Sequence, residues 1–213
     1  MTLTGTAAAP ARPAPDVDNF PAYVGFGLAY LLGHGSAALS RGADPLLELP
    51  GWLPMTLLGA GLAVGTVQAT LAALRAQRAA TAPGDVLSGQ LLGAAWISAF
   101  AALFLAITGL AATLDSPDVQ TLLWPTGSGL VVGLLYVAEG AVRRNVLHYT
   151  LGTWLALTST AALLLGSPGL YWTLTLAGGG AYAVAAVLER RRITRAISAA
   201  AAQSAPEAYQ TTS

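Results

Sequence analysis

Six apolar segments, separated by short polar breaks, run through the chain. They cover residues 21–40, 53–74, 87–113, 122–142, 146–166 and 169–188. A helix needs about 20 apolar residues to cross about 30 Å of hydrocarbon, and each segment is close to that length. The breaks, such as RGADPLLELPG and SPG, supply the Pro, Gly and Asp residues that end helices. The pattern predicts an all-α membrane protein with a bundle of six transmembrane helices over residues 20–195.

The composition also favours a membrane protein. Of the 213 residues, 54% are hydrophobic and only 9% are charged, whereas a soluble domain carries about 25% charged residues. All ten basic residues are arginines, and all but Arg41 fall on one side of a six-span topology. Because positively charged loops stay in the cytoplasm, we expect both termini to be cytoplasmic and the protein to reside in the cytoplasmic membrane. The arginines on that side are Arg12, Arg75, Arg78, Arg143, Arg144, Arg190, Arg191, Arg192 and Arg195.

The two ends of the chain have the composition of tails. Residues 1–19 are rich in Ala and Pro and lack the apolar core of a signal peptide. Residues 196–213 are rich in Ala, Gln and Ser. We expect both stretches to be disordered cytoplasmic tails, since neither has the large apolar residues needed to form a core.

Several functions lack the residues that they need. The net charge of zero argues against a nucleic-acid partner. The chain has no Cys, and it contains no HExxH, GxSxG, Walker or CxxC motif. Asp residues occur only in the predicted tails and loops, so no intramembrane carboxylate pair is expected to hold a metal. We expect no enzymatic activity, no cofactor and no metal site.

Small residues recur every four positions within several spans, which places them on one helix face. Helices in lipid approach closely where such residues meet, since no hydrophobic effect draws them together. The pattern predicts a compact bundle, with surface left for a homo-oligomer. The two clearest stripes are Gly25, Ala29, Gly33 and Ala37 in the first span, and Gly61, Gly65, Ala69 and Ala73 in the second.

Polar side chains inside the predicted spans are the candidates for function, because unpaired ones are costly in hydrocarbon. Phe26, Tyr30 and His34 are four residues apart and share a helix face. His34 either bonds to a neighbouring carbonyl or lines a polar route, and its charge is easily changed near neutral pH. Gln68, in the second span, either bridges two helices or faces the same route.

The fifth span carries hydroxyl groups and an aromatic ring. Thr153 and Trp154 favour a mixed aromatic and hydroxyl face, although membrane threonines often bond to their own helix backbone. Near the predicted cytoplasmic surface, Glu139 precedes Arg143 by four residues, a spacing that favours an ion pair. We expect His148 to be an interfacial residue.

Short motifs mark the starts of several spans. Asn19-Phe20-Pro21-Ala22, followed by Gly25-Phe26-Gly27, opens the first span. Further along lie Gln68 in a small-residue helix, Gly93-Ala94-Ala95-Trp96, Arg144-Asn145-Val146-Leu147, and Gly178 to Tyr182. Over about residues 18–195 this order resembles the acetate uptake (succinate–acetate) transporter family, whose members open with Asn-Pro-Ala-Pro and Gly-Phe-Gly. The chain departs from the family where Phe20 interrupts the signature, Tyr23 replaces its second Pro, and the polar cluster of the first span is reduced to His34.

The resemblance implies a hexamer in which each protomer holds its own pathway for small carboxylates. In the family this pathway narrows at an apolar ring from the first, third and fifth spans, where Phe26, Leu92 and Trp154 fall in this chain. Such a ring gates by excluding water. Asn19 and the backbone at Pro21, where a proline leaves a carbonyl unpaired, would contact substrate on the cytoplasmic side.

Two functions remain open. One is a transporter or channel for small carboxylates such as acetate, with or without proton coupling. The other is a membrane subunit that transports nothing and scaffolds or regulates a partner complex. A carboxylate-free passage within each protomer would favour the first. The residues predicted to line it are Asn19, Pro21, Phe26, Tyr30, His34, Gln68, Leu92, Thr153 and Trp154.

Overall fold

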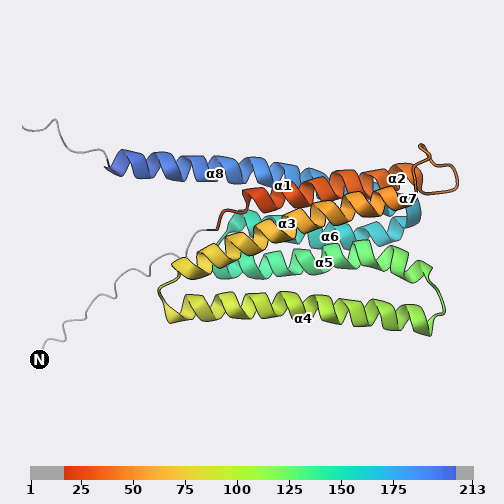
Figure 1. Cartoon of the computed structure of the whole chain (residues 1–213), viewed down its shortest axis with the longest axis horizontal. Coiled ribbons are helices and arrows are strands. Elements are labelled where there is room, and N and C mark those ends of the chain that lie inside the picture. The colour runs from red at the N-terminus through yellow and green to blue at the C-terminus, as the bar shows by residue number, and fades with distance from the viewer. Residues whose placement is uncertain (1–16, 205–213) are drawn as a thin grey trace, which may run out of the picture.

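The computed structural model describes residues 17–204, within which the chain forms helices and no strands. Figure 1 shows an elongated bundle, with α4 along one edge and α1 and α8 along the other. Most of the two predicted tails, residues 1–16 and 205–213, lies outside the described residues. In chain order the elements are α1 Phe20–Leu28, η1 Ala29–His34, α2 Gly35–Ser40, α3 Trp52–Ala79, α4 Pro83–Thr113, α5 Asp118–Arg143, α6 Val146–Ala162, η2 Leu163–Leu165, α7 Gly166–Thr173, η3 Leu174–Gly179 and α8 Gly180–Ser204.

The first helical stretch is continuous from α1 through η1 to α2. Ala29 and Gly35, at its two junctions, keep helical backbone angles. Between them η1 is a wider π-helical turn, a feature that often occurs at functional sites. The stretch ends where Arg41 becomes extended, with φ −111° and ψ 157°.

Small residues bring this stretch against α3. A Cβ atom on Gly25 would lie 2.6 Å from the backbone nitrogen of Gly65, and one on Gly61 would lie 2.6 Å from Cα of Ala29. No side chain fits in so little space, so these positions need glycine. The close helix packing that the two stripes predict is confirmed.

α5 and α6 are antiparallel neighbours that pack along much of their length. A Cβ atom on Gly133 would lie 2.5 Å from the backbone nitrogen of Ala156 and 2.7 Å from the carbonyl oxygen of Gly152. Arg144, in a left-handed conformation, and Asn145 form the short connection between the two helices. The side chain of Asn145 accepts a hydrogen bond from the His148 N–H and so caps the start of α6.

α4 packs mainly on α5 and leaves the rest of its surface open. Among its residues only Ile107 and Ala111 are buried, whereas Leu91, Ile97 and Leu105 are 61%, 76% and 68% exposed. Apolar side chains this exposed suit contact with lipid or with another membrane protein.

The chain reverses direction after α6. Gly166 has a positive φ of 58°, and Ser167 is extended with φ −87° and ψ 136°. α7, η3 and α8 then pack back along α6. α8 continues to Ser204, whereas the sequence predicts a disordered tail from residue 196. The Ala-rich stretch that follows residue 196 has high helix propensity and extends the helix.

Four helical stretches are long and apolar enough to cross a membrane, as in a multi-pass membrane protein: Trp52–Ala79, Pro83–Thr113, Asp118–Arg143 and Val146–Ala199. The first three contain the predicted spans 53–74, 87–113 and 122–142. The fourth contains both 146–166 and 169–188. The predicted span 21–40 is divided among α1, η1 and α2, none of which is long enough by itself. The count of six spans therefore stays a prediction.

The bundle has two distinct ends. The end of α3, the junction of α5 and α6 and the end of α8 lie at the same end of the bundle in Figure 1. We call this the arginine-rich end, because those segments carry Arg75, Arg78, Arg143, Arg144 and Arg190. α1 also begins toward this end, while Arg41 starts the loop at the opposite end.

Candidate functional site

A file of buried tyrosine and histidine rings occupies the core of the bundle. Each ring is at most 6% exposed, and together they come from α1, η1, α5, α6, α7 and α8. Phenol and imidazole groups both donate and accept hydrogen bonds, so each of these side chains can exchange protons with a hydrogen-bonded neighbour. We call it the aromatic file, which consists of Tyr23, Tyr30, His34, Tyr136, His148, Tyr171 and Tyr182.

Neighbouring rings of the file are close enough to touch. No step between successive ring centroids exceeds 6.3 Å. Tyr136 packs beside the start of the file, with its centroid 4.0 Å from that of His148. The steps are His148–Tyr23 5.9 Å, Tyr23–Tyr182 6.3 Å, Tyr182–Tyr30 5.3 Å, Tyr30–His34 4.9 Å and His34–Tyr171 6.1 Å.

Four side chains from four helices form a polar cluster toward the arginine-rich end of the file. The Tyr23 hydroxyl lies 2.7 Å from His148 Nδ1. On the other side of the ring, His148 Nε2 lies 3.3 Å from a carboxylate oxygen of Glu139. The other oxygen of Glu139 accepts a 2.7 Å hydrogen bond from the Trp96 indole.

This cluster corrects one sequence prediction. Glu139 contacts His148 and Trp96 instead of forming the predicted ion pair with Arg143. His148 is 4% exposed and is therefore buried within the bundle, while its interfacial depth in the membrane stays a prediction. The helix spacing of Glu139 and Arg143 does not decide the pairing, because α6 and α4 bring closer partners. Sequence reasoning missed this cluster, although ionisable residues within apolar helices are a recognised signal of function.

A second buried carboxylate fixes the start of α1 against α8. Glu189 is fully buried, and its two oxygens accept 2.8 Å hydrogen bonds from Arg192. It also accepts a 3.1 Å bond from the backbone N–H of Asn19. Glu139 and Glu189 both lie inside the bundle toward this end, so the core here is not free of carboxylates, as the passage expected of a transporter would be.

The opposite end of the file meets a guanidinium group. Arg41 donates a 3.1 Å hydrogen bond to the Tyr171 hydroxyl, and its Cζ lies 5.1 Å from the centre of that ring. The Tyr171 hydroxyl is also 3.4 Å from the Thr121 carbonyl. Within residues 17–204 no carboxylate pairs with Arg41, so its remaining N–H groups are available to an anion.

The glycines on either side of His34 let two neighbouring helices approach it. A Cβ atom on Gly33 would lie 2.6 Å from Leu58 of α3, and one on Gly35 would meet Thr175 of η3 at 3.4 Å. His34 itself is 4% exposed and lies between Tyr30 and Tyr171. The two π-helical turns, η1 and η3, therefore contact each other around the middle of the file.

The three residues of the predicted apolar ring lie in separate parts of the bundle. Phe26 is buried against Gly65 and Tyr182. Leu92 borders a small hollow between α3, α4 and α5 at the arginine-rich end. Trp154 is 49% exposed and donates a 2.9 Å hydrogen bond to the Ala177 carbonyl. The structure does not bring them together, because Leu92 lies against α3 and α5 at the arginine-rich end and Trp154 lies on the exposed side of α6.

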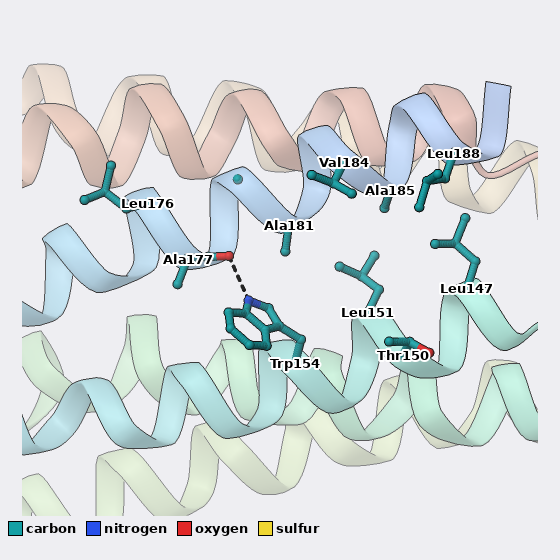
Figure 2. Close-up of a pocket in the computed structure, with 11 residues that line it drawn as sticks. Leu147, Thr150, Leu151, Trp154, Leu176, Ala177, Ala181, Val184, Ala185 and Leu188 are labelled. Atoms are coloured by element: carbon teal, nitrogen blue, oxygen red, sulfur yellow. Dashed lines mark hydrogen bonds between the residues drawn. The ribbon is translucent and has the colours of Figure 1, made fainter. Parts of the chain in front are cut away.

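Trp154 borders the larger hollow, an open groove of about 430 Å³ between α6 and the stretch formed by η3 and α8. Figure 2 shows Leu147, Leu151 and Trp154 pointing from α6 across the groove, with the Trp154 indole reaching the opposite backbone. The lining is almost entirely apolar. It includes Leu147, Leu151, Leu176, Val184 and Leu188.

The other predicted pathway residues do not meet in one cavity. Pro21 is half-buried in the first turn of α1, and the Asn19 carbonyl accepts a 2.9 Å bond from the Tyr23 N–H. Gln68 is half-buried on α3 and makes no hydrogen bond with any residue in the described part of the chain. Thr153 bonds to the Tyr149 carbonyl of its own helix, the structural alternative noted for membrane threonines.

No cluster of three or more His, Asp or Glu side chains that could hold a metal ion occurs within residues 17–204. The site consists of aromatic, imidazole, carboxylate and guanidinium groups, which can bind protons and organic anions.

Comparisons with known proteins leave the family open. No protein-family model matches the chain, and no curated protein and no solved structure matches it. The resemblance to acetate uptake transporters therefore stays a prediction. What identifies the chain is its architecture: a helical, multi-pass membrane protein with a buried file of tyrosines and histidines.

Proposed function

We propose that the chain is a proton-coupled transporter of small monocarboxylates such as acetate, located in the cytoplasmic membrane with six spans and both termini inside. The four long apolar stretches account for most of the proposed spans. The continuous helix over residues 20–40 reaches about 30 Å at 1.5 Å per residue, enough for a further span. The reversal at Gly166 divides the last stretch into two.

The observation that carries the proposal is the aromatic file. Buried ionisable residues in membrane helices are costly and commonly mark ion or proton pathways. Here buried tyrosines and histidines continue from His148, which contacts Glu139 near one end, to Tyr171, which contacts Arg41 at the other. A bundle that only needed to pack could fill this core with Leu and Ile.

The file is closely packed, so transport requires the helices to move apart. The π-helical turns η1 and η3 contact each other at the middle of the file and bear Tyr30, His34 and Thr175. π-helical turns inside α-helices occur frequently at functional sites. We propose that α1 and α8 separate at these turns to admit the substrate.

Arg41 is the proposed first contact for the carboxylate at the end opposite the arginine-rich one. Arg41→Gln should raise the KM for uptake about tenfold, because a hydrogen bond to a charged group contributes about 1.5–3 kcal/mol. Initial rates of labelled acetate uptake into proteoliposomes measure this. Arg75→Gln, at an exposed position on α3, is the matched control and should leave KM unchanged. Equal KM values for the two variants would contradict the role of Arg41.

A second function, a membrane subunit that scaffolds or regulates a partner, is favoured by a different observation. α4 buries only Ile107 and Ala111 and exposes long apolar side chains such as Ile97. That face is suited to another helix, from a different protein or from another copy in a homo-oligomer such as a hexamer. Purification in mild detergent followed by native mass spectrometry separates these cases. A stoichiometric second chain favours the scaffold, and a homo-oligomer favours the transporter.

A further inference from the structure

The polar cluster of Tyr23, Glu139 and His148 places a buried imidazole against a carboxylate. His148 Nε2 is buried and lies 3.3 Å from a carboxylate oxygen of Glu139, a contact that does not have the geometry of a full hydrogen bond. Charge-assisted hydrogen bonds are shorter, at about 2.7–2.9 Å, so this contact can tighten if the ring becomes charged. The other ring nitrogen is held by the Tyr23 hydroxyl at 2.7 Å.

The groups that face this imidazole come from every helix packed around it. α4 contributes the Trp96 indole, which bonds to Glu139, and α5 contributes Glu139 itself and Tyr136. α6 contributes the Asn145 side chain, which accepts from the His148 backbone N–H. Other charged and titratable groups of the same end are Arg143 on α5 and Tyr182, Glu189 and Arg192 on α8. Glu189 and Arg192 form an ion pair with each other, which leaves Glu139 as the carboxylate in contact with the ring.

The arrangement determines which nitrogen carries the proton of the neutral ring. A carboxylate facing Nε2 favours the tautomer with its hydrogen on that nitrogen, since a lone pair there would face negative charge. Nδ1 is then an acceptor, and the Tyr23 hydroxyl donates to it. The neutral ring is therefore ready to accept a second proton at Nδ1.

We propose that Glu139, His148 and Tyr23 form the proton-binding site of the bundle. One proton from a hydronium ion forms an N–H bond at His148 Nδ1, and a water molecule is released. The Tyr23 hydroxyl turns from donor to acceptor, and the imidazolium pairs with the Glu139 carboxylate. Because Tyr23 belongs to α1, proton uptake changes the bonding between α1 and α6 at the start of the aromatic file. The role of this site in coupling protons to transport rests on the proposed function. The binding of a proton by His148 does not.

Imidazole ¹⁵N NMR of the full-length protein in lipid tests the site without reference to transport. The chain has two histidines, so ¹⁵N-histidine labelling gives two sets of ring signals, which a His34→Gln variant assigns. On acidification, His148 should pass from the singly to the doubly protonated form, with the added proton at Nδ1. Glu139→Gln should weaken its proton affinity about tenfold or more, because an opposite charge at this distance favours the charged form.

Two further variants complete the design. Tyr23→Phe removes the hydroxyl and keeps the ring, and it should weaken proton binding while the protein remains folded. Glu48→Gln, at an exposed loop position, should not change the titration. A His148 that stays neutral down to pH 5, or one whose titration is the same in Glu139→Gln and Tyr23→Phe as in the wild type, would overturn the proposal. If His148 titrates as expected and vesicles show no uptake, the site stands and the transport function fails.

Discussion

Glu189→Ala is expected to lower the free energy of unfolding by about 3 kcal/mol. Glu189 is fully buried, and it joins Arg192 of α8 to the backbone of Asn19 at the start of α1. Removing it takes away a fully buried charged partner of Arg192 and the acceptor of the Asn19 N–H. The value is at the lower end of the range for a broken buried ion pair, because the Arg192 side chain is 34% exposed.

Thermal or SDS-induced unfolding of the purified protein, followed by circular dichroism, measures this loss. Glu48→Ala is the control, since Glu48 is an exposed loop residue and its substitution should change stability by less than about 0.5 kcal/mol. Equal stability of the two variants would show that Glu189 does not hold α1 against α8.

Gly133→Ala is expected to destabilise the protein by about 1–3 kcal/mol through overpacking. The added methyl group would lie 2.5 Å from the backbone nitrogen of Ala156, and backbone cannot move aside as a flexible side chain can. The helices α5 and α6 would have to separate along their contact, which also supports Tyr136 and His148.

Gly93→Ala provides a matched comparison for this prediction. Gly93 lies in α4, and a Cβ atom there meets nothing within 4 Å. In a helix interior this change should stabilise slightly or have no effect, because Ala has a higher helix propensity than Gly. The same unfolding measurement applies to both variants, and a larger loss for Gly93→Ala would contradict the packing described for α5 and α6.

The sequence was sufficient to predict the parts of the fold that depend on local pattern. Spans 53–74, 87–113 and 122–142 lie inside α3, α4 and α5, since length and apolar composition decide whether a helix can cross a bilayer. The close approach of Gly25 to Gly65 also follows from a pattern, because small residues four apart share a helix face.

The candidate site was predicted only in part, because its contacts join distant segments. Tyr30 and His34 were identified from their shared helix face, and both lie in the aromatic file. The partners of His148 come from α1 and α5, and no spacing along the chain indicates that Tyr23 and Glu139 lie on opposite sides of one ring.

The π-helical turns and the apolar ring show two further limits of pattern reasoning. Residues 29–34 and 174–179 contain no motif that distinguishes a π-helical turn from regular helix. Phe26, Leu92 and Trp154 were taken from the order of motifs in a family. Their side-chain directions depend on how each helix is rotated in this bundle, which motif order does not specify.

Counterflow of labelled acetate shows whether the bundle carries a monocarboxylate across a membrane. Proteoliposomes that contain the purified protein and unlabelled acetate are diluted into labelled acetate at pH values from 5 to 8, with protein-free vesicles as the background for passive diffusion. We expect counterflow above that background, a faster initial rate with an inward proton gradient, and a strong loss of both in His34→Ala. Rates equal to those of protein-free vesicles at every pH, from protein that remains folded and homogeneous, would contradict this expectation.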